Sequence, residues 1–63
     1  MKWKNTAFKF KDIAELTKRE LDEAGIKTDL FRTGDDDYWY VGWLAIGEAQ
    51  NRKALEIITQ HID

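Results

Sequence analysis

The sequence predicts an α+β fold that forms a two-layer sandwich, with the element order β-α-β-β-α. Three observations lead to this prediction: two segments with apolar residues at helical spacing, three segments with the composition or alternation of strands, and no linker rich in Gly, Ser or Pro that would divide the 63 residues. The expected strands cover about residues 3–10, 26–32 and 38–46, and the expected helices cover about residues 13–24 and 48–62. Residues 1–63 are therefore expected to form a single compact domain.

The first strand and the first helix follow one another directly. Phe8 and Phe10 alternate onto the same face of the strand, which is the face expected to be buried. Asp12 is expected to cap the helix through its side-chain oxygen, with Glu15 at the spacing of a capping box. Gly25 is expected to end the helix, because glycine readily adopts the left-handed conformation found at helix C-termini.

The remaining strands predict the topology of the sheet. The second strand carries Lys27 and Asp29, and charges suit a sheet edge because they discourage pairing with another chain. The turn at residues 33–37 makes the second and third strands antiparallel, and a right-handed crossover makes the first and second strands parallel. The third strand, from Tyr38 to Ile46, is apolar on both alternating faces and therefore belongs in the centre. We expect the sheet order 1-3-2, with both helices on one face.

The hydrophobic core is expected between the sheet and the two helices. The second helix presents a stripe of residues at helical spacing, namely Asn51, Ala54, Leu55, Ile58 and Ile62. Eight apolar side chains are expected among the buried residues: Phe8, Phe10, Leu16, Leu21, Leu30, Val41, Leu55 and Ile58.

The third strand also sets the functional expectation, because two short helices can cover only one face of the sheet. We favour the register in which Trp39 and Trp43 face the helices, since two Trp rings bury more apolar area and a Tyr can keep its hydroxyl in water. A slip of one residue would exchange the two faces, so the opposite register stays open at this point. In the favoured register the exposed, partner-binding rings are Tyr38, Tyr40, Phe31 and Trp3.

An exposed aromatic face of this kind indicates an interaction surface. We expect a small non-enzymatic binding module that regulates or inhibits a larger protein, and phage-encoded inhibitors of host machinery are one class of such proteins. The alternatives are a weak single-stranded nucleic-acid binder that stacks bases on the same rings, and a structural homodimer of two packed open faces. Ten Lys and Arg against twelve Asp and Glu give a net charge of −2, without the basic excess of a dedicated nucleic-acid binder, which favours a protein partner.

No catalytic, cofactor or metal site is expected. The chain has neither Ser nor Cys, and its one histidine, His61, is expected to lie in solvent or to stabilise a helix dipole. The acidic turn at Asp35–Asp37 lacks the Glu that a calcium loop needs at its twelfth position, where Ile46 stands, so we expect a solvated turn. No apolar stretch approaches a membrane span or a signal-peptide core, so a cytoplasmic protein without membrane association is expected.

Overall fold

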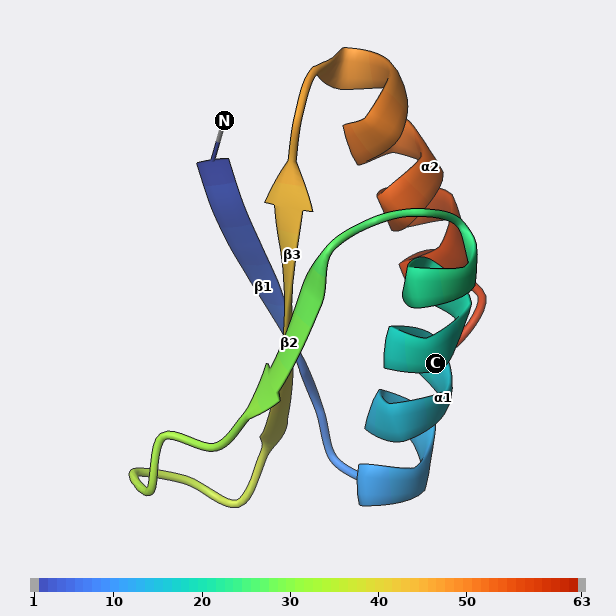
Figure 1. The fold of residues 1–63 in the computed structure, drawn as a ribbon. Helices are drawn as coiled ribbons and strands as arrows, with labels where there is room; N and C mark the ends of the chain where they lie inside the picture. Colours follow the sequence, from blue (N-terminus) through green and yellow to red (C-terminus); the bar gives the residue numbers. More distant parts are fainter. Residues whose placement is uncertain (1, 63) are drawn as a thin grey trace.

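The computed structural model describes residues 2–62, which form a three-stranded sheet with two helices packed on one face (Figure 1). The elements are β1 (Lys2–Phe8), α1 (Lys11–Glu23), β2 (Thr28–Phe31), β3 (Trp39–Ala45) and α2 (Glu48–Thr59). The sheet order is β1-β3-β2, and β3 runs antiparallel to both of its neighbours. The predicted element order, sheet order and single layer of helices are confirmed.

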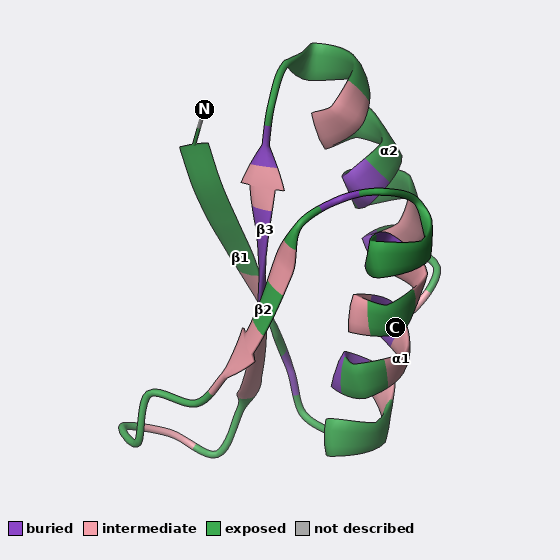
Figure 2. Ribbon diagram, viewed as in Figure 1, coloured by how far each residue is buried: buried purple, intermediate pink, exposed green. Residues whose placement is uncertain are grey.

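The register of β3 decides which side chains enter the core. Val41 and Trp43 are buried with apolar residues of both helices, so the favoured register is confirmed. Trp39 also faces the helices, but it lies at the margin of the core and is only partly buried. Most buried positions lie on β3 and on the helices, whereas β1 is exposed along most of its length (Figure 2).

Two of the expected core residues are not buried, and both corrections follow from element boundaries. Phe10 is 66% exposed, because β1 ends at Phe8 and the chain has turned out of the sheet before Phe10 becomes the N-cap of α1. Leu55 is 45% exposed, because α2 turns Ala54 and Ile58 toward the core and thereby rotates Leu55 toward solvent. Leu16 and Leu30 are partly buried, and the other four expected side chains are fully buried.

Fewer residues of the stripe predicted on α2 are buried than expected. Ala54 and Ile58 are buried, and Asn51 is partly buried. Ile62 is 52% exposed because α2 ends at Thr59, so the helical spacing no longer places Ile62 over the sheet.

The sequence predicted the C-terminal end of α1 correctly but not its N-terminal cap. The capping box is wrong: α1 begins at Lys11, and Asp12 lies inside the first turn, where it favours the helix dipole without forming a side-chain cap. The C-terminal stop at Gly25 is confirmed by its φ of +83°. The Gly25 N–H donates to Asp22 O at 3.0 Å and the Ile26 N–H to Leu21 O at 3.0 Å, which is the pattern of a Schellman motif. The buried Ile26 therefore belongs to this helix end and not to β2.

Candidate functional site

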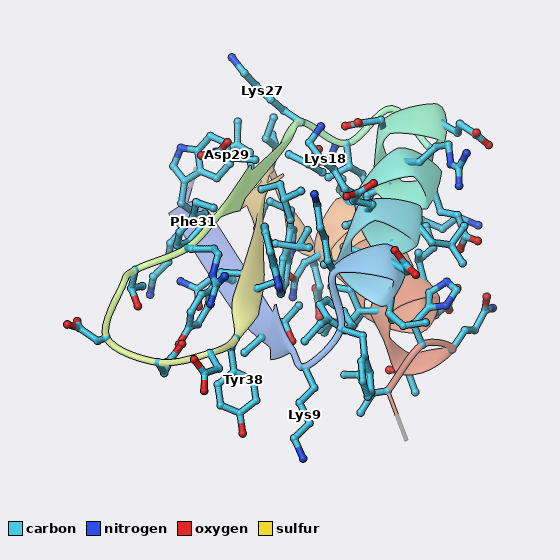
Figure 3. All side chains as sticks on the ribbon, turned by 90° about the horizontal axis from the view of Figure 1, so that it is seen from below. Lys9, Lys18, Lys27, Asp29, Phe31 and Tyr38 are labelled. Atoms are coloured by element: carbon cyan, nitrogen blue, oxygen red, sulfur yellow. The ribbon has the colours of Figure 1, made fainter. Side chains whose placement is uncertain are left out.

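The face of the sheet opposite the helices is built from three rows of side chains that the strand register aligns. Trp3 pairs with Leu44 across β1 and β3. The next row on this face is polar and runs from Asn5 through Gly42 to Asp29, and the third row runs from Ala7 through Tyr40 to Phe31. We call this surface the open face, and it comprises Trp3, Asn5, Ala7, Asp29, Phe31, Tyr40, Gly42 and Leu44. Figure 3 shows Asp29 and Phe31 on the side of the sheet away from the helices.

The third row holds a pair of rings in a fixed arrangement. Phe31 and Tyr40 are direct cross-strand partners, and their rings stack with centroids 5.5 Å apart and planes inclined by 13°. The Tyr40 hydroxyl donates a hydrogen bond to a carboxylate oxygen of Asp36. The other carboxylate oxygen of Asp36 accepts the Tyr38 N–H at 2.9 Å, so the acidic turn and the stacked pair hold one another in place.

This hydrogen bonding shifts the acid–base properties of both partners. The bonds from the Tyr40 hydroxyl and from the Tyr38 N–H stabilise the ionised carboxylate and lower the pKa of Asp36 below its ordinary value. The same bond raises the pKa of Tyr40, because the phenol loses its donor role on ionisation, and burial and the charge of Asp36 act in the same direction. The stacked pair is therefore anchored to a group that carries negative charge at neutral pH.

A hollow of about 230 Å³ lies in the polar row between Trp3 and Phe31. Its remaining lining comes from Lys4, Asn5, Asp29 and Gly42. A Cβ atom placed on Gly42 would lie 3.4 Å from Cε1 of Phe31 and 3.8 Å from Cε3 of Trp3. Trp3 comes from β1 and Phe31 from β2, so rings from the two outer strands flank a glycine on the central strand.

The structure brings three of the four sequence-predicted rings together. Trp3 is 52% exposed, and Phe31 and Tyr40 are half-buried by their mutual stacking and by their neighbours on the sheet. Tyr38 lies one residue before β3, and its ring extends away from the sheet (Figure 3). It is therefore separate from the hollow and contributes to this region through its backbone N–H to Asp36.

Sequence reasoning missed two residues of the hollow. The sequence suggests only a protective role at a sheet edge for Asp29 and no site role for Gly42, yet the register places them side by side on the open face. The available signal was a glycine in the middle of an aromatic strand, which is typical of a site where another group approaches the backbone closely.

Charges around the open face are arranged unevenly. No Lys, Arg or His nitrogen of residues 2–62 is ion-paired with Asp29. The Arg32 guanidinium instead lies 4.6 Å from the centroid of the Trp39 ring, on the helix side, where Lys11 Nζ also lies over that ring at 5.3 Å. The ammonium group of Lys27 points outward from the end of β2 (Figure 3). Asp29 is thus an anionic group on the open face without a cationic partner in the described part of the chain.

Two other candidate regions have a different character. His61 is not free in solvent: its Nε2 lies 2.8 Å from a carboxylate oxygen of Glu20, so the pair links the segment after α2 to α1. A cavity of about 260 Å³ beside His61 is lined by Phe10, Ile13 and Ile62, among others. In the acidic turn, Asp36 engages Tyr38 and Tyr40, and residues 2–62 contain no cluster of three or more His, Cys, Asp or Glu arranged to hold a metal ion.

Within residues 2–62, no helix combines the length and the apolar character needed to cross a membrane. Comparisons of the chain with protein-family models, with curated proteins and with solved structures found no match.

Proposed function

We propose that this protein is a non-enzymatic binding module that regulates or inhibits a larger protein through its open face. The observation that carries the proposal is the exposed Trp3 beside the stacked Phe31–Tyr40 pair on the sheet face opposite α1 and α2. Hot spots at protein interfaces are enriched in Trp and Tyr, so a cluster that contains Trp3 and Tyr40 has the composition of a hot spot. The stacking and the Tyr40–Asp36 bond support the proposal further, because rings that are already ordered lose little entropy on binding.

The volume and the ionisable groups of the open face do not favour catalysis. Sites for small-molecule substrates usually have volumes of about 300–1,000 Å³. The hollow of about 230 Å³ is smaller, and Asp29 is the only carboxylate of the open face, with no histidine beside it to complete an acid–base pair. These features support binding of one side chain of a macromolecule over turnover of a substrate.

A nucleic-acid partner is the second candidate, since the rings could stack bases. The charges weigh against it. Asp29 lies within the face and Asp36 is bonded to Tyr40 at its end, and both carboxylates would repel phosphate. Salt separates the two candidates, because binding to phosphates weakens steeply as salt rises whereas an apolar protein interface does not.

The experiment compares capture of partners from a lysate of the source organism by the immobilised protein and by three variants. Trp3→Ala and Tyr40→Ala change the open face, and Leu55→Ala removes a partly exposed apolar side chain from α2 as a matched control. If the open face is the binding surface, each open-face variant should bind a captured protein at least about fivefold more weakly, which corresponds to a loss of about 1 kcal/mol. Leu55→Ala should bind like the wild type.

Two readouts decide between the alternatives. Sedimentation velocity of the same variants shows whether the open face instead joins two copies of this chain. A salt series, with a single-stranded oligonucleotide as probe, shows whether it binds nucleic acid. Capture that is equal for all three variants and the wild type, with no self-association, would refute the proposed function.

A further inference from the structure

The hollow above Gly42 has a chemical character that the rest of the open face lacks. Two aromatic residues, Trp3 on β1 and Phe31 on β2, line it from the rows on either side, and Asp29 and Asn5 lie in the row between them. An anionic group between aromatic walls is a recurring arrangement for binding a cation, because the faces of aromatic rings carry negative electrostatic potential.

We propose that this hollow binds the guanidinium group of an arginine side chain presented by the partner polypeptide. This inference rests on the proposed function, because it names the chemistry of the partner that the open face would recognise. Trp3 and Phe31 would flank the planar guanidinium, and Asp29 would accept its hydrogen bonds.

The charge pattern supports a cationic ligand. Asp29 has no ion-pair partner within residues 2–62, so an incoming cation would not have to displace an internal one. Two other cationic groups, those of Arg32 and Lys11, lie over the Trp39 ring on the helix side. The Asp36 carboxylate, which accepts the hydrogen bond of the Tyr40 hydroxyl, places a second negative charge at the end of this face.

The shape supports arginine over lysine. The hollow is about the size of one large side chain, with a volume of about 230 Å³. A guanidinium is planar, stacks on aromatic rings and offers paired donors to a carboxylate, whereas an ammonium is a compact and strongly hydrated point charge. Walls made of two rings therefore match the guanidinium better.

Glycine at position 42 is explained by the space that it leaves. Its φ lies outside the left-handed region, which within residues 2–62 holds Gly25, Gly34 and Gly47, so the backbone at Gly42 does not require glycine. Glycine in the interior of a strand weakens the strand. A Cβ atom would meet only ordinary contacts, at 3.4 Å or more, so alanine is excluded neither by conformation nor by crowding. An added side chain would instead occupy space at the base of the hollow, which Gly42 lines.

The test uses nuclear magnetic resonance titrations of the full chain with two N-acetylated, C-amidated tripeptides. One is Gly-Arg-Gly, and the other replaces arginine with citrulline, which has nearly the same shape but no charge. At constant ionic strength, the arginine peptide should shift the amide signals of Gly42 and Asp29 and the indole signal of Trp3 in a saturable manner. The citrulline peptide should bind at least about threefold more weakly, as expected for the loss of one cation–π contact and one ion pair.

Three variants locate the site. Asp29→Asn should weaken binding of the arginine peptide about threefold or more, whereas Asp37→Asn, which removes the same charge from an exposed position in the turn, should leave it nearly unchanged. Gly42→Ala should also weaken binding by occupying the floor of the hollow. Amide spectra of each variant verify the fold, and Asp29→Asn alone suffices as the test if Gly42→Ala disturbs the sheet.

The inference fails if arginine and citrulline peptides bind equally, or if Asp29→Asn behaves like Asp37→Asn. Its failure is distinguishable from that of the proposed function. If neither peptide binds, yet Tyr40→Ala abolishes capture of a partner, the open face is an interaction surface of other specificity and the arginine pocket is wrong. If the arginine peptide binds as expected but no partner depends on the open face, the pocket is present and the proposed function is wrong.

Discussion

The two sides of β3 differ in what covers them, although their residues alternate along the same seven-residue strand. Trp43 faces the helices and is only 3% exposed, because α1 and α2 complete its surroundings. Gly42, its neighbour, faces the opposite way, and its nearest neighbours there are side-chain and backbone atoms of the adjacent strands. On the helix side a large residue is buried in the core, whereas on the open face the smallest residue leaves a hollow. Stability and binding are therefore expected to depend on different, alternating positions.

The strongest test of this comparison makes the same substitution on both faces. Trp43→Ala removes a buried ring and should lower the free energy of unfolding by about 3–5 kcal/mol, which is enough to unfold a domain of this size. Trp3→Ala removes a ring that is already 52% exposed, and its cost should be about 1 kcal/mol or less. Urea denaturation followed by circular dichroism measures both. Equal losses for the two variants would show that the open face is a second core and not a surface.

A smaller change in the free energy of unfolding, of opposite sign, is expected for Gly42→Ala. Alanine fits the space above this residue, and in a strand interior it should stabilise the fold by about 0.5–1 kcal/mol, because the unfolded chain loses less freedom on folding. For a domain of this length the melting temperature should rise by a few degrees. A rise in melting temperature together with weaker binding of the arginine peptide would sharpen the comparison, since one substitution would then act oppositely on the two properties. A lower melting temperature would mean that the sheet needs glycine here for structural reasons.

The smallest effect concerns the acidic turn at the end of the open face. The pKa of Asp36 is lower in the folded protein, so the stabilisation from its bonds is present above the pKa of the unfolded chain and is lost as the pH falls through the folded pKa. Because Asp36 is at the surface, the effect should be modest and screened by salt. Asp36→Asn should make the melting temperature less dependent on pH between neutral and strongly acidic conditions.

Asp22 provides the control for this measurement. The Thr28 hydroxyl and Lys18 also lower the pKa of Asp22, so the Asp36→Asn variant should keep some acid sensitivity. At high pH the same variant should bring the phenol titration of Tyr40 closer to its ordinary range, since the hydrogen bond to Asp36 is the largest cause that raises the Tyr40 pKa. An unchanged titration of Tyr40 in Asp36→Asn would mean that the turn does not anchor the stacked pair.

The topology could be predicted because several independent signals agree on it. Apolar character on both faces of residues 38–46 requires a central strand, and the short turn before it determines an antiparallel neighbour. The choice of register was also accessible, since two Trp on one face bury more area than two Tyr. These arguments use large differences in apolar area, which sequence patterns report well.

The remaining features depend on differences of a single residue. Phe10 and Leu55 were expected in the core because each continues an apolar pattern, but β1 stops two residues before Phe10 and Leu55 lies one helical step from the buried Ala54. The hollow depends on how three strands align, because only their shared register places Asn5, Gly42 and Asp29 in one row. No pattern within a single strand contains that information, and so the rings were predicted while the space between them was not.

The position of β1 at the edge of the sheet has a consequence for motion. This strand pairs with β3 alone and is exposed along most of its length, yet it supplies Trp3 and Asn5 to the hollow. Local opening of an edge strand exposes its amides to exchange with solvent while the rest of the domain stays folded. An arginine side chain bound between Trp3 and Phe31 would contact both edge strands, β1 and β2, and would link the two edges of the sheet. Binding at the open face should therefore slow deuterium uptake by the backbone amides of β1, including amides that the bound side chain does not contact.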